Sequence, residues 1–119
     1  MIHLPGVFAI VLVTIAGGLG AVSRLFLAQW QAKLPWGILL ANSLASAVLG
    51  LALHGSEGTL IVASAFAGGL STFSSFAAQT AQFVSAGQHL RAFLNIALNF
   101  ALPSTAVILG ALVASALLK

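Results

Sequence analysis

The sequence predicts an all-α membrane protein, with four transmembrane helices, the third of them broken, in one domain over residues 1–119. Of the 119 residues 61% are hydrophobic and only 4% charged, whereas a soluble domain has about 25% charged residues. The apolar residues fall into four runs separated by short loops. Each run is too long for a strand and lacks alternation with period two. The third run contains two adjacent glycines followed by four hydroxyl residues, which predicts an interruption inside the membrane.

The first segment is expected over about residues 5–28. Its front end carries no Lys or Arg, and the apolar run exceeds the 7–15 residues typical of a signal peptide. It is long enough for a span, which needs roughly 20 apolar residues. Gly17, Gly18 and Gly20 give it a small-residue face suited to close helix contact.

The other three segments are expected over about residues 37–54, 59–86 and 91–118. The third is longer than one span requires, and Gly68 and Gly69 would divide it into two pieces. In the fourth, Pro103 is expected to kink the helix because proline lacks the amide hydrogen and clashes with the preceding turn.

Charge leaves the orientation open. Four spans place both termini, Lys119 and Glu57 on one side and Lys33, Arg91 and Arg24 on the other. The cytoplasmic side normally has an excess of Lys and Arg, and here the excess is one or two residues. One interpretation is insertion in both directions, which suits an antiparallel dimer. The other is a single orientation with the more basic side in the cytoplasm. No basic run is present, so no nucleic-acid partner is expected.

The side chains predict transport of an anion and no enzyme activity. There is no cysteine, the only acidic residue, Glu57, lies in a loop, and His3, His54 and His89 lie at segment ends. Proton-coupled transport usually needs an ionisable group within a span. Neutral donors and the positive edges of phenyl rings can instead replace the hydration shell of a small anion. The alternative is that these groups only bond their own backbone or hold helices together. The uncharged polar residues of the spans are Asn42, Ser43, Ser46, Ser71, Thr72, Ser74, Ser75, Asn95, Asn99, Ser104 and Thr105.

Three stretches resemble the signatures of one family. GGLSTFSSF, residues 68–76, resembles the GGLTTFSTF signature of the Fluc (CrcB) fluoride channels. GGLGAVSR, residues 17–24, resembles their GGxxGAxxR pattern, and WGILLANSLASAVLG, residues 36–50, resembles GTLxVNxxGxFxxG. The resemblance implies an antiparallel, dual-topology homodimer in the inner (plasma) membrane of a microbe. Its two pores would export fluoride passively and confer fluoride resistance, with a sodium ion at the dimer centre.

The resemblance also implies roles for individual residues. Phe73 and Phe76 match the phenylalanines that line the fluoride path, and Asn42 matches an asparagine that donates to the anion. Gly68 and Ser71 match the positions whose backbone carbonyls hold the sodium.

Further pathway residues follow less directly from the motifs. Ser75 keeps a hydroxyl donor where the signature has Thr, Ser74 lies beside it, and Arg24 matches an arginine that draws anions toward a vestibule. The family's fourth helix usually carries a hydroxyl track that begins with Tyr, and this chain has no Tyr. Asn95 and Asn99 are expected to replace part of that track. Ser104 or Thr105 would extend it.

Departures from the family patterns leave room for other functions. Ile38, Ala45 and Ala47 stand where the second-helix pattern has Thr, Gly and Phe. One alternative is that the chain is a non-conducting partner that completes a heterodimer with a paralogous subunit. A proton-coupled multidrug exporter of similar size is the remaining alternative, although such exporters use a carboxylate in the first span and this chain has none there.

Overall fold

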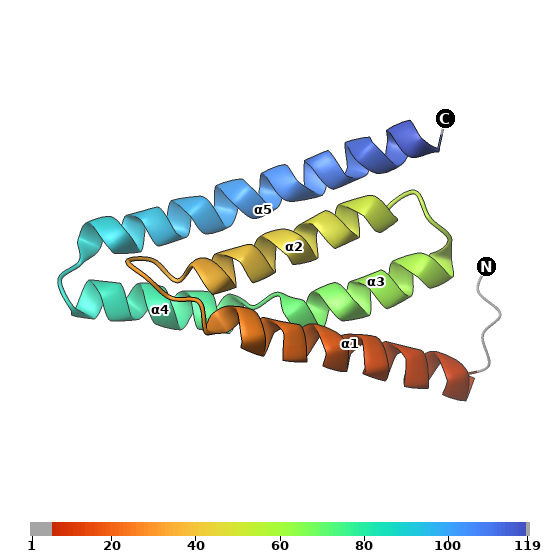
Figure 1. The fold of residues 1–119 in the computed structure, drawn as a ribbon, viewed down its shortest axis with the longest axis horizontal. Helices are drawn as coiled ribbons and strands as arrows, with labels where there is room; N and C mark the ends of the chain where they lie inside the picture. The colour runs from red at the N-terminus through yellow and green to blue at the C-terminus, as the bar shows by residue number, and fades with distance from the viewer. Residues whose placement is uncertain (1–5, 119) are drawn as a thin grey trace.

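The chain folds into five α-helices and no strand over residues 6–118, which are the residues that the computed structural model describes. The predictions for His3, for the start of the first segment at residue 5 and for Lys119 concern positions outside this range. The helices, in chain order, are α1 (Gly6–Ala28), α2 (Trp36–Ala52), α3 (Glu57–Leu70), α4 (Phe73–Ser85) and α5 (His89–Leu117) (Figure 1).

The helices lie side by side in a slab of 53 × 33 × 18 Å. Three stretches are long and apolar enough to cross a membrane, namely α1, α5 and the α3–α4 pair taken together. The fourth apolar helix, α2, has 17 residues and is about 26 Å long at 1.5 Å per residue. The start of α1, the α2–α3 connection and the end of α5 lie at one end of the slab, and the α1–α2 and α4–α5 connections lie at the other (Figure 1).

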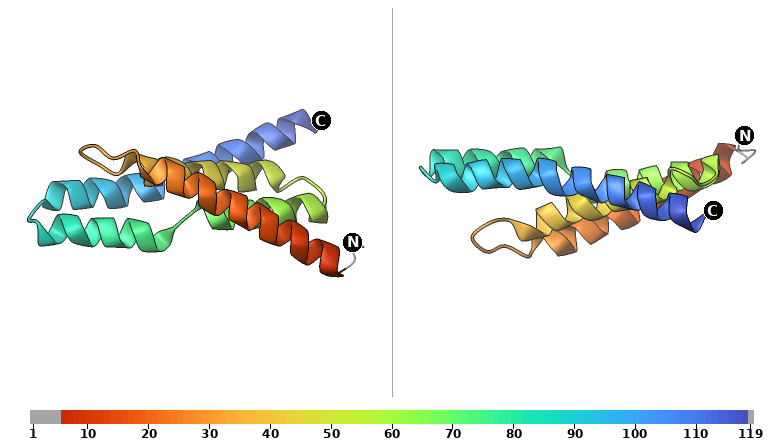
Figure 2. Two further views of the ribbon diagram at one scale, coloured as in Figure 1. Left: turned by 60° about the horizontal axis from the view of Figure 1, so that its bottom comes forward. Right: turned by 90° about the horizontal axis from the view of Figure 1, so that it is seen from above.

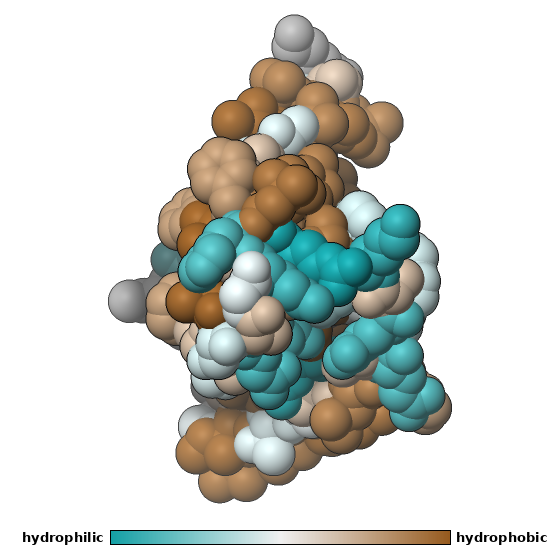
Figure 3. Space-filling view, turned by 90° about the vertical axis from the view of Figure 1, so that its left-hand side faces the viewer, coloured by the Kyte–Doolittle hydropathy of each residue, from teal (hydrophilic) through white to brown (hydrophobic). Residues whose placement is uncertain are grey.

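Polar residues concentrate at the end formed by the α1–α2 and α4–α5 connections. These two connections diverge in space (Figure 2), and hydrophilic surface gathers between apolar flanks when this end is viewed directly (Figure 3). Gln31, Lys33, Gln88 and His89 are exposed there. The predicted separation of this basic end from Glu57, which begins α3 at the opposite end, is confirmed.

Glycines allow α1 and α3 to touch backbone to backbone. A methyl group on Gly20 of α1 would collide with the carbonyl of Phe66 and the amide of Leu70 in α3. One on Gly69 would collide with the carbonyl of Gly17. Because no side chain larger than hydrogen fits at these contacts, the glycines let α1 pack directly against the last turn of α3.

The pair α2 and α5 meets in the same way. A methyl on Gly50 would collide with the carbonyl of Val107, and one on Gly110 would lie 2.6 Å from the carbonyl of Ala47. Between the two pairs lies a small core of Ala41, Ala45, Ala67 and Leu70. Ala45, one of the departures from the family pattern, is 2% exposed and contributes to this core.

The third segment is broken, as predicted, but the predicted position was wrong. Gly68 and Gly69 are helical, and α3 ends at Leu70. Ser71 and Thr72 are extended, with φ/ψ of −80°/155° and −152°/126°, and α4 begins at Phe73. The paired glycines therefore serve the contact with α1, while the interruption occurs where side chains replace the helical hydrogen bonds.

The α4–α5 turn places these two helices antiparallel and side by side. Gly87 has φ = 74°, a left-handed conformation that glycine adopts without strain. The amide of Gly87 donates to the carbonyl of Val84 (3.0 Å) and that of Gln88 to the carbonyl of Phe83 (2.8 Å), the two bonds of a Schellman motif. The tight turn brings α4 residues opposite the first turns of α5. Within α5, the helix continues through Pro103 over its 29 residues.

Candidate functional site

A cleft of about 320 Å³ lies beside the break, between α2, α4 and α5. No side chain that lines it is ionisable. The lining residues are Asn42, Ser46, Ser71, Thr72, Phe73, Phe76, Asn99, Phe100 and Pro103. Four of the predicted pathway residues, Asn42, Phe73, Phe76 and Asn99, therefore share one cleft, together with Ser71.

The carboxamide of Asn42 replaces part of the missing helical hydrogen bonding at the break. Its Oδ1 accepts a hydrogen bond from the amide of Thr72 (2.8 Å), and its Nδ2 donates to the carbonyl of Thr72 (3.3 Å). The hydroxyl of Thr72 in turn accepts from the amide of Ser75 (3.1 Å) and so caps α4. Polar backbone groups within an apolar bundle must be satisfied internally. The side chains of Asn42 and Thr72 do this for the amides of Thr72 and Ser75 and for the carbonyl of Thr72.

Two carbonyls at the break lose their helical donors as a consequence. In a continuous helix the amide of Thr72 would donate to Gly68, and the amide of Ser75 would donate to Ser71. Both amides are instead bonded to side chains, of Asn42 and Thr72 respectively. The carbonyl oxygens of Gly68 and Ser71 are thereby released from helical pairing. The family resemblance implies a sodium site at these two positions, and this stays a prediction.

Three phenyl rings form the aromatic side of the cleft. Phe76 is 8% exposed. Its ring centroid lies 5.7 Å from that of Phe73, with 58° between the planes, and 6.4 Å from that of Phe100, at 87°. Such tilted and edge-on pairs direct positive ring edges sideways. Phe73 is 75% exposed, so one side of the cleft is open. Phe100 was not predicted, because only its packing against Phe76 distinguishes it from Phe93, the other phenylalanine of α5.

A chain of side-chain amides continues from Asn42 into α5 and back to α4. Asn42 Nδ2 donates to Asn99 Oδ1 (3.0 Å), and Asn99 Nδ2 donates to the Oδ1 (3.1 Å) and carbonyl (2.8 Å) of Asn95. Asn95 Nδ2 donates to the Thr80 hydroxyl (3.0 Å), which donates to the carbonyl of Phe76 (2.9 Å). Asn95 is 2% exposed. We call this the amide chain.

The structure places the other predicted residues outside the cleft lining. Arg24 is half-buried near the end of α1, Ser74 is exposed and Ser75 half-buried. The hydroxyl of Ser74 lies 3.3 Å from that of Thr72. Ser46 does line the cleft but was not among the predicted site residues.

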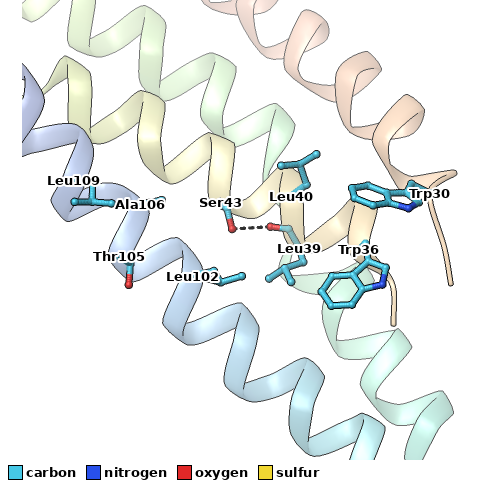
Figure 4. Close-up of a pocket in the computed structure, with 9 residues that line it drawn as sticks. All are labelled: Trp30, Trp36, Leu39, Leu40, Ser43, Leu102, Thr105, Ala106 and Leu109. Atoms are coloured by element: carbon cyan, nitrogen blue, oxygen red, sulfur yellow. Dashed lines mark hydrogen bonds between the residues drawn. The ribbon is translucent and has the colours of Figure 1, made fainter. Parts of the chain in front are cut away.

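Thr105, one of the two residues expected to extend the track of α5, lies outside the cleft lining. Its hydroxyl donates to the carbonyl of Ala101 (2.8 Å), and it lines a separate apolar groove of about 390 Å³ with Trp30 and Trp36 (Figure 4). Ser43 faces the same groove and donates to the carbonyl of Leu39 (2.8 Å). Thr105 follows Asn99 by six positions, which places the two side chains about 120° apart around the helix.

The chain matches one protein family and several named proteins over most of its length. The family described as "CrcB-like protein, Camphor Resistance (CrcB)" matches residues 11–111. A relative from Pyrococcus abyssi is 37% identical, with 87% of this chain and 93% of the relative covered. One from Pyrococcus furiosus is 40% identical, with 85% and 91% covered. Both are named "Fluoride-specific ion channel FluC". A relative from Rubrobacter xylanophilus, 37% identical with 81% and 85% covered, is named "Fluoride-specific ion channel FluC 1".

Proposed function

The chain belongs to the CrcB-like family, and from this premise we propose that it is a multi-pass membrane channel specific for fluoride, which leaves the cell passively down its gradient. The observation that carries the proposal is the composition of the cleft. Uncharged amide groups and phenyl rings converge beside a helix break, and none of the lining side chains is ionisable.

Fluoride is small and strongly hydrated, so a pathway through lipid must offer replacements for its water. Amide hydrogens and ring edges provide these without a fixed positive charge that would trap the ion. Without an ionisable lining residue the cleft has no group to couple movement of the ion to a proton. These properties favour a passive channel.

The direct test is efflux from vesicles that contain this protein alone. An ion-selective electrode is expected to record fluoride release much faster than chloride release. Equal release of both ions, or release no faster than from protein-free vesicles, would refute the proposal.

We propose further that all four apolar segments cross the bilayer and that two copies assemble antiparallel. The slab is only 18 Å thick, Phe73 is 75% exposed although it lines the cleft, and Gly68 is exposed at the break. A second copy related by a two-fold axis would cover this side of both chains. Because such an interface is isologous, it would complete one pathway per chain, two per dimer.

Dual topology can be tested with a single cysteine, since the chain has none. Gln88 lies exposed in the α4–α5 connection. We expect a membrane-impermeant maleimide to label about half of the Gln88→Cys protein in intact cells, because the two subunits of an antiparallel pair present this turn to opposite sides. Labelling of nearly all or nearly none of the protein would indicate a single orientation.

We also propose a sodium ion between the two breaks. The carbonyls of Gly68 and Ser71 support it, because the amides that would pair with them are bonded to side chains, and rings of free backbone carbonyls are ligands for alkali ions. When bound, the ion would supply positive charge that holds the two breaks together. Replacing sodium by a large organic cation is therefore expected to lower fluoride efflux, and unchanged efflux would argue against the site.

A heteromeric channel is the second candidate. The numeral in the name of the Rubrobacter relative, FluC 1, favours it. In that case this chain alone would give no efflux, and a second family member added to the vesicles would restore it. A proton-coupled exporter has less support, since α1 contains neither Asp nor Glu.

A further inference from the structure

The amide chain has one direction, set at both of its ends. The backbone amide of Thr72 can only donate, so it requires the oxygen of Asn42 and turns Asn42 Nδ2 toward Asn99. At the far end the Thr80 hydroxyl gives its single proton to the carbonyl of Phe76. Thr80 therefore accepts from the next member of the chain.

This direction occupies the donors that an anion would need. Asn42 Nδ2 has two hydrogens, and its partners are the carbonyl of Thr72 and Asn99 Oδ1. Asn99 Nδ2 is likewise bonded twice to Asn95. In this arrangement, the oxygen of Asn99 stands where an anion would accept a hydrogen bond from Asn42.

Reversing the chain would release these donors. If the carboxamide of Asn99 turns over, its Nδ2 and that of Asn42 both face the cleft. The carboxamide of Asn95 must then turn as well, and its oxygen meets Thr80. A hydroxyl can donate as readily as it accepts, so Thr80 can supply the terminal bond of the reversed chain.

The two directions use Thr80 unequally. In the observed direction Thr80 makes two hydrogen bonds, one to Phe76 and one from Asn95, whereas in the reversed direction it makes one, to Asn95. The observed direction also keeps the bond from Asn99 to the carbonyl of Asn95. Reversal would place the oxygen of Asn99 against that carbonyl, a contact of two acceptors that the bonds to the ion would have to offset. Thr80 therefore stabilises the self-bonded arrangement.

We propose that Thr80 is a positioning residue that holds the amide chain in its self-bonded direction, and that an entering fluoride ion reverses the chain. This inference rests on the proposed function. Thr80 itself is not among the residues that line the cleft. It acts on the ion through Asn95 and Asn99, by setting how much fluoride is needed to turn their amides toward the cleft.

The test is the fluoride dependence of efflux in Thr80→Val. Since the substitution removes one more bond from the self-bonded direction than from the reversed one, we expect the half-saturating fluoride concentration to fall by about fivefold, the effect of one net hydrogen bond. Thr80→Ser, which keeps the hydroxyl, is expected to behave like wild type. Thr105→Val is the matched control, because Thr105 makes the same bond to the carbonyl four residues earlier but lies in the separate groove.

A half-saturating concentration that is unchanged or raised in Thr80→Val, while wild type conducts, would overturn the inference and leave the proposed function intact. Wild-type vesicles that release no fluoride would instead refute the proposed function.

A second measurement needs no variant. In wild-type protein labelled with nitrogen-15, fluoride is expected to shift the side-chain amide signals of Asn42, Asn99 and Asn95 together. A shift confined to Asn42 would exclude reversal.

Discussion

Asn42→Asp is expected to abolish fluoride efflux while the protein still assembles. The two side chains have nearly the same shape. In the wild-type chain the Thr72 amide donates to Asn42 Oδ1 over 2.8 Å, and one carboxylate oxygen of the aspartate would still accept this hydrogen bond. The other oxygen would replace Nδ2 and face two acceptors, the carbonyl of Thr72 (3.3 Å) and Asn99 Oδ1 (3.0 Å). The cleft would lose a donor and gain a negative charge.

The size of this effect follows from charge repulsion. Two like charges 4 Å apart repel by about 4 kcal/mol at an effective dielectric constant of 20, and each 1.4 kcal/mol is a factor of ten. We therefore expect vesicle efflux to fall by a factor of about 100 or more. Ser43→Ala is the control on the same helix, because Ser43 lines the separate groove. Efflux from Asn42→Asp vesicles within about tenfold of wild type would show that Asn42 does not face the ion.

Phe76→Ile is the second large effect that we expect. The phenyl ring is 8% exposed and contacts two other rings, Phe73 and Phe100. Isoleucine fills much of the volume but has no positive edge, so the change removes the electrostatic contribution of the ring and leaves most of the packing. We expect fluoride efflux to fall at least about tenfold, with a loss of unfolding free energy of about 1–2 kcal/mol.

The control for this variant is Phe93→Ile, which makes the same exchange at a residue that is 65% exposed and does not line the cleft. Efflux should be measured with an electrode and stability by thermal unfolding in detergent. If Phe76→Ile and Phe93→Ile conduct equally well, the aromatic side of the cleft does not contribute to passage of the ion.

Hydropathy alone located the helices, because each apolar run is long and bounded by polar turns. It did not locate the break, since adjacent glycines mark a weak helix and a close contact equally well. Here Gly69 is helical and contacts Gly17 of α1, so the glycine pair marks a close helix contact and not the break. The extended residues are Ser71 and Thr72. The hydrogen bonds of Thr72 depend on Asn42, which lies 30 residues earlier in the chain.

Thr80 was missed for a related reason. Its role depends on facing Asn95, and that register is set by the turn at Gly87. Its only local signal is that it follows Phe76 by one helical turn. The roles implied for Gly68 and Ser71 are predictions that the freed carbonyls support. The role implied for Arg24 concerns a vestibule. Arg24 lies outside the cleft lining, and its role stays a prediction.

The shortness of α2 affects the membrane around the protein. With 17 residues it measures about 26 Å, against about 30 Å for the hydrocarbon core, so lipid headgroups and water are drawn inward at its ends. Asn42 lies six residues from the first residue of α2, about 9 Å in. Local thinning of the bilayer would therefore shorten the dehydrated part of the route, and transport should slow in vesicles made from lipids with longer tails.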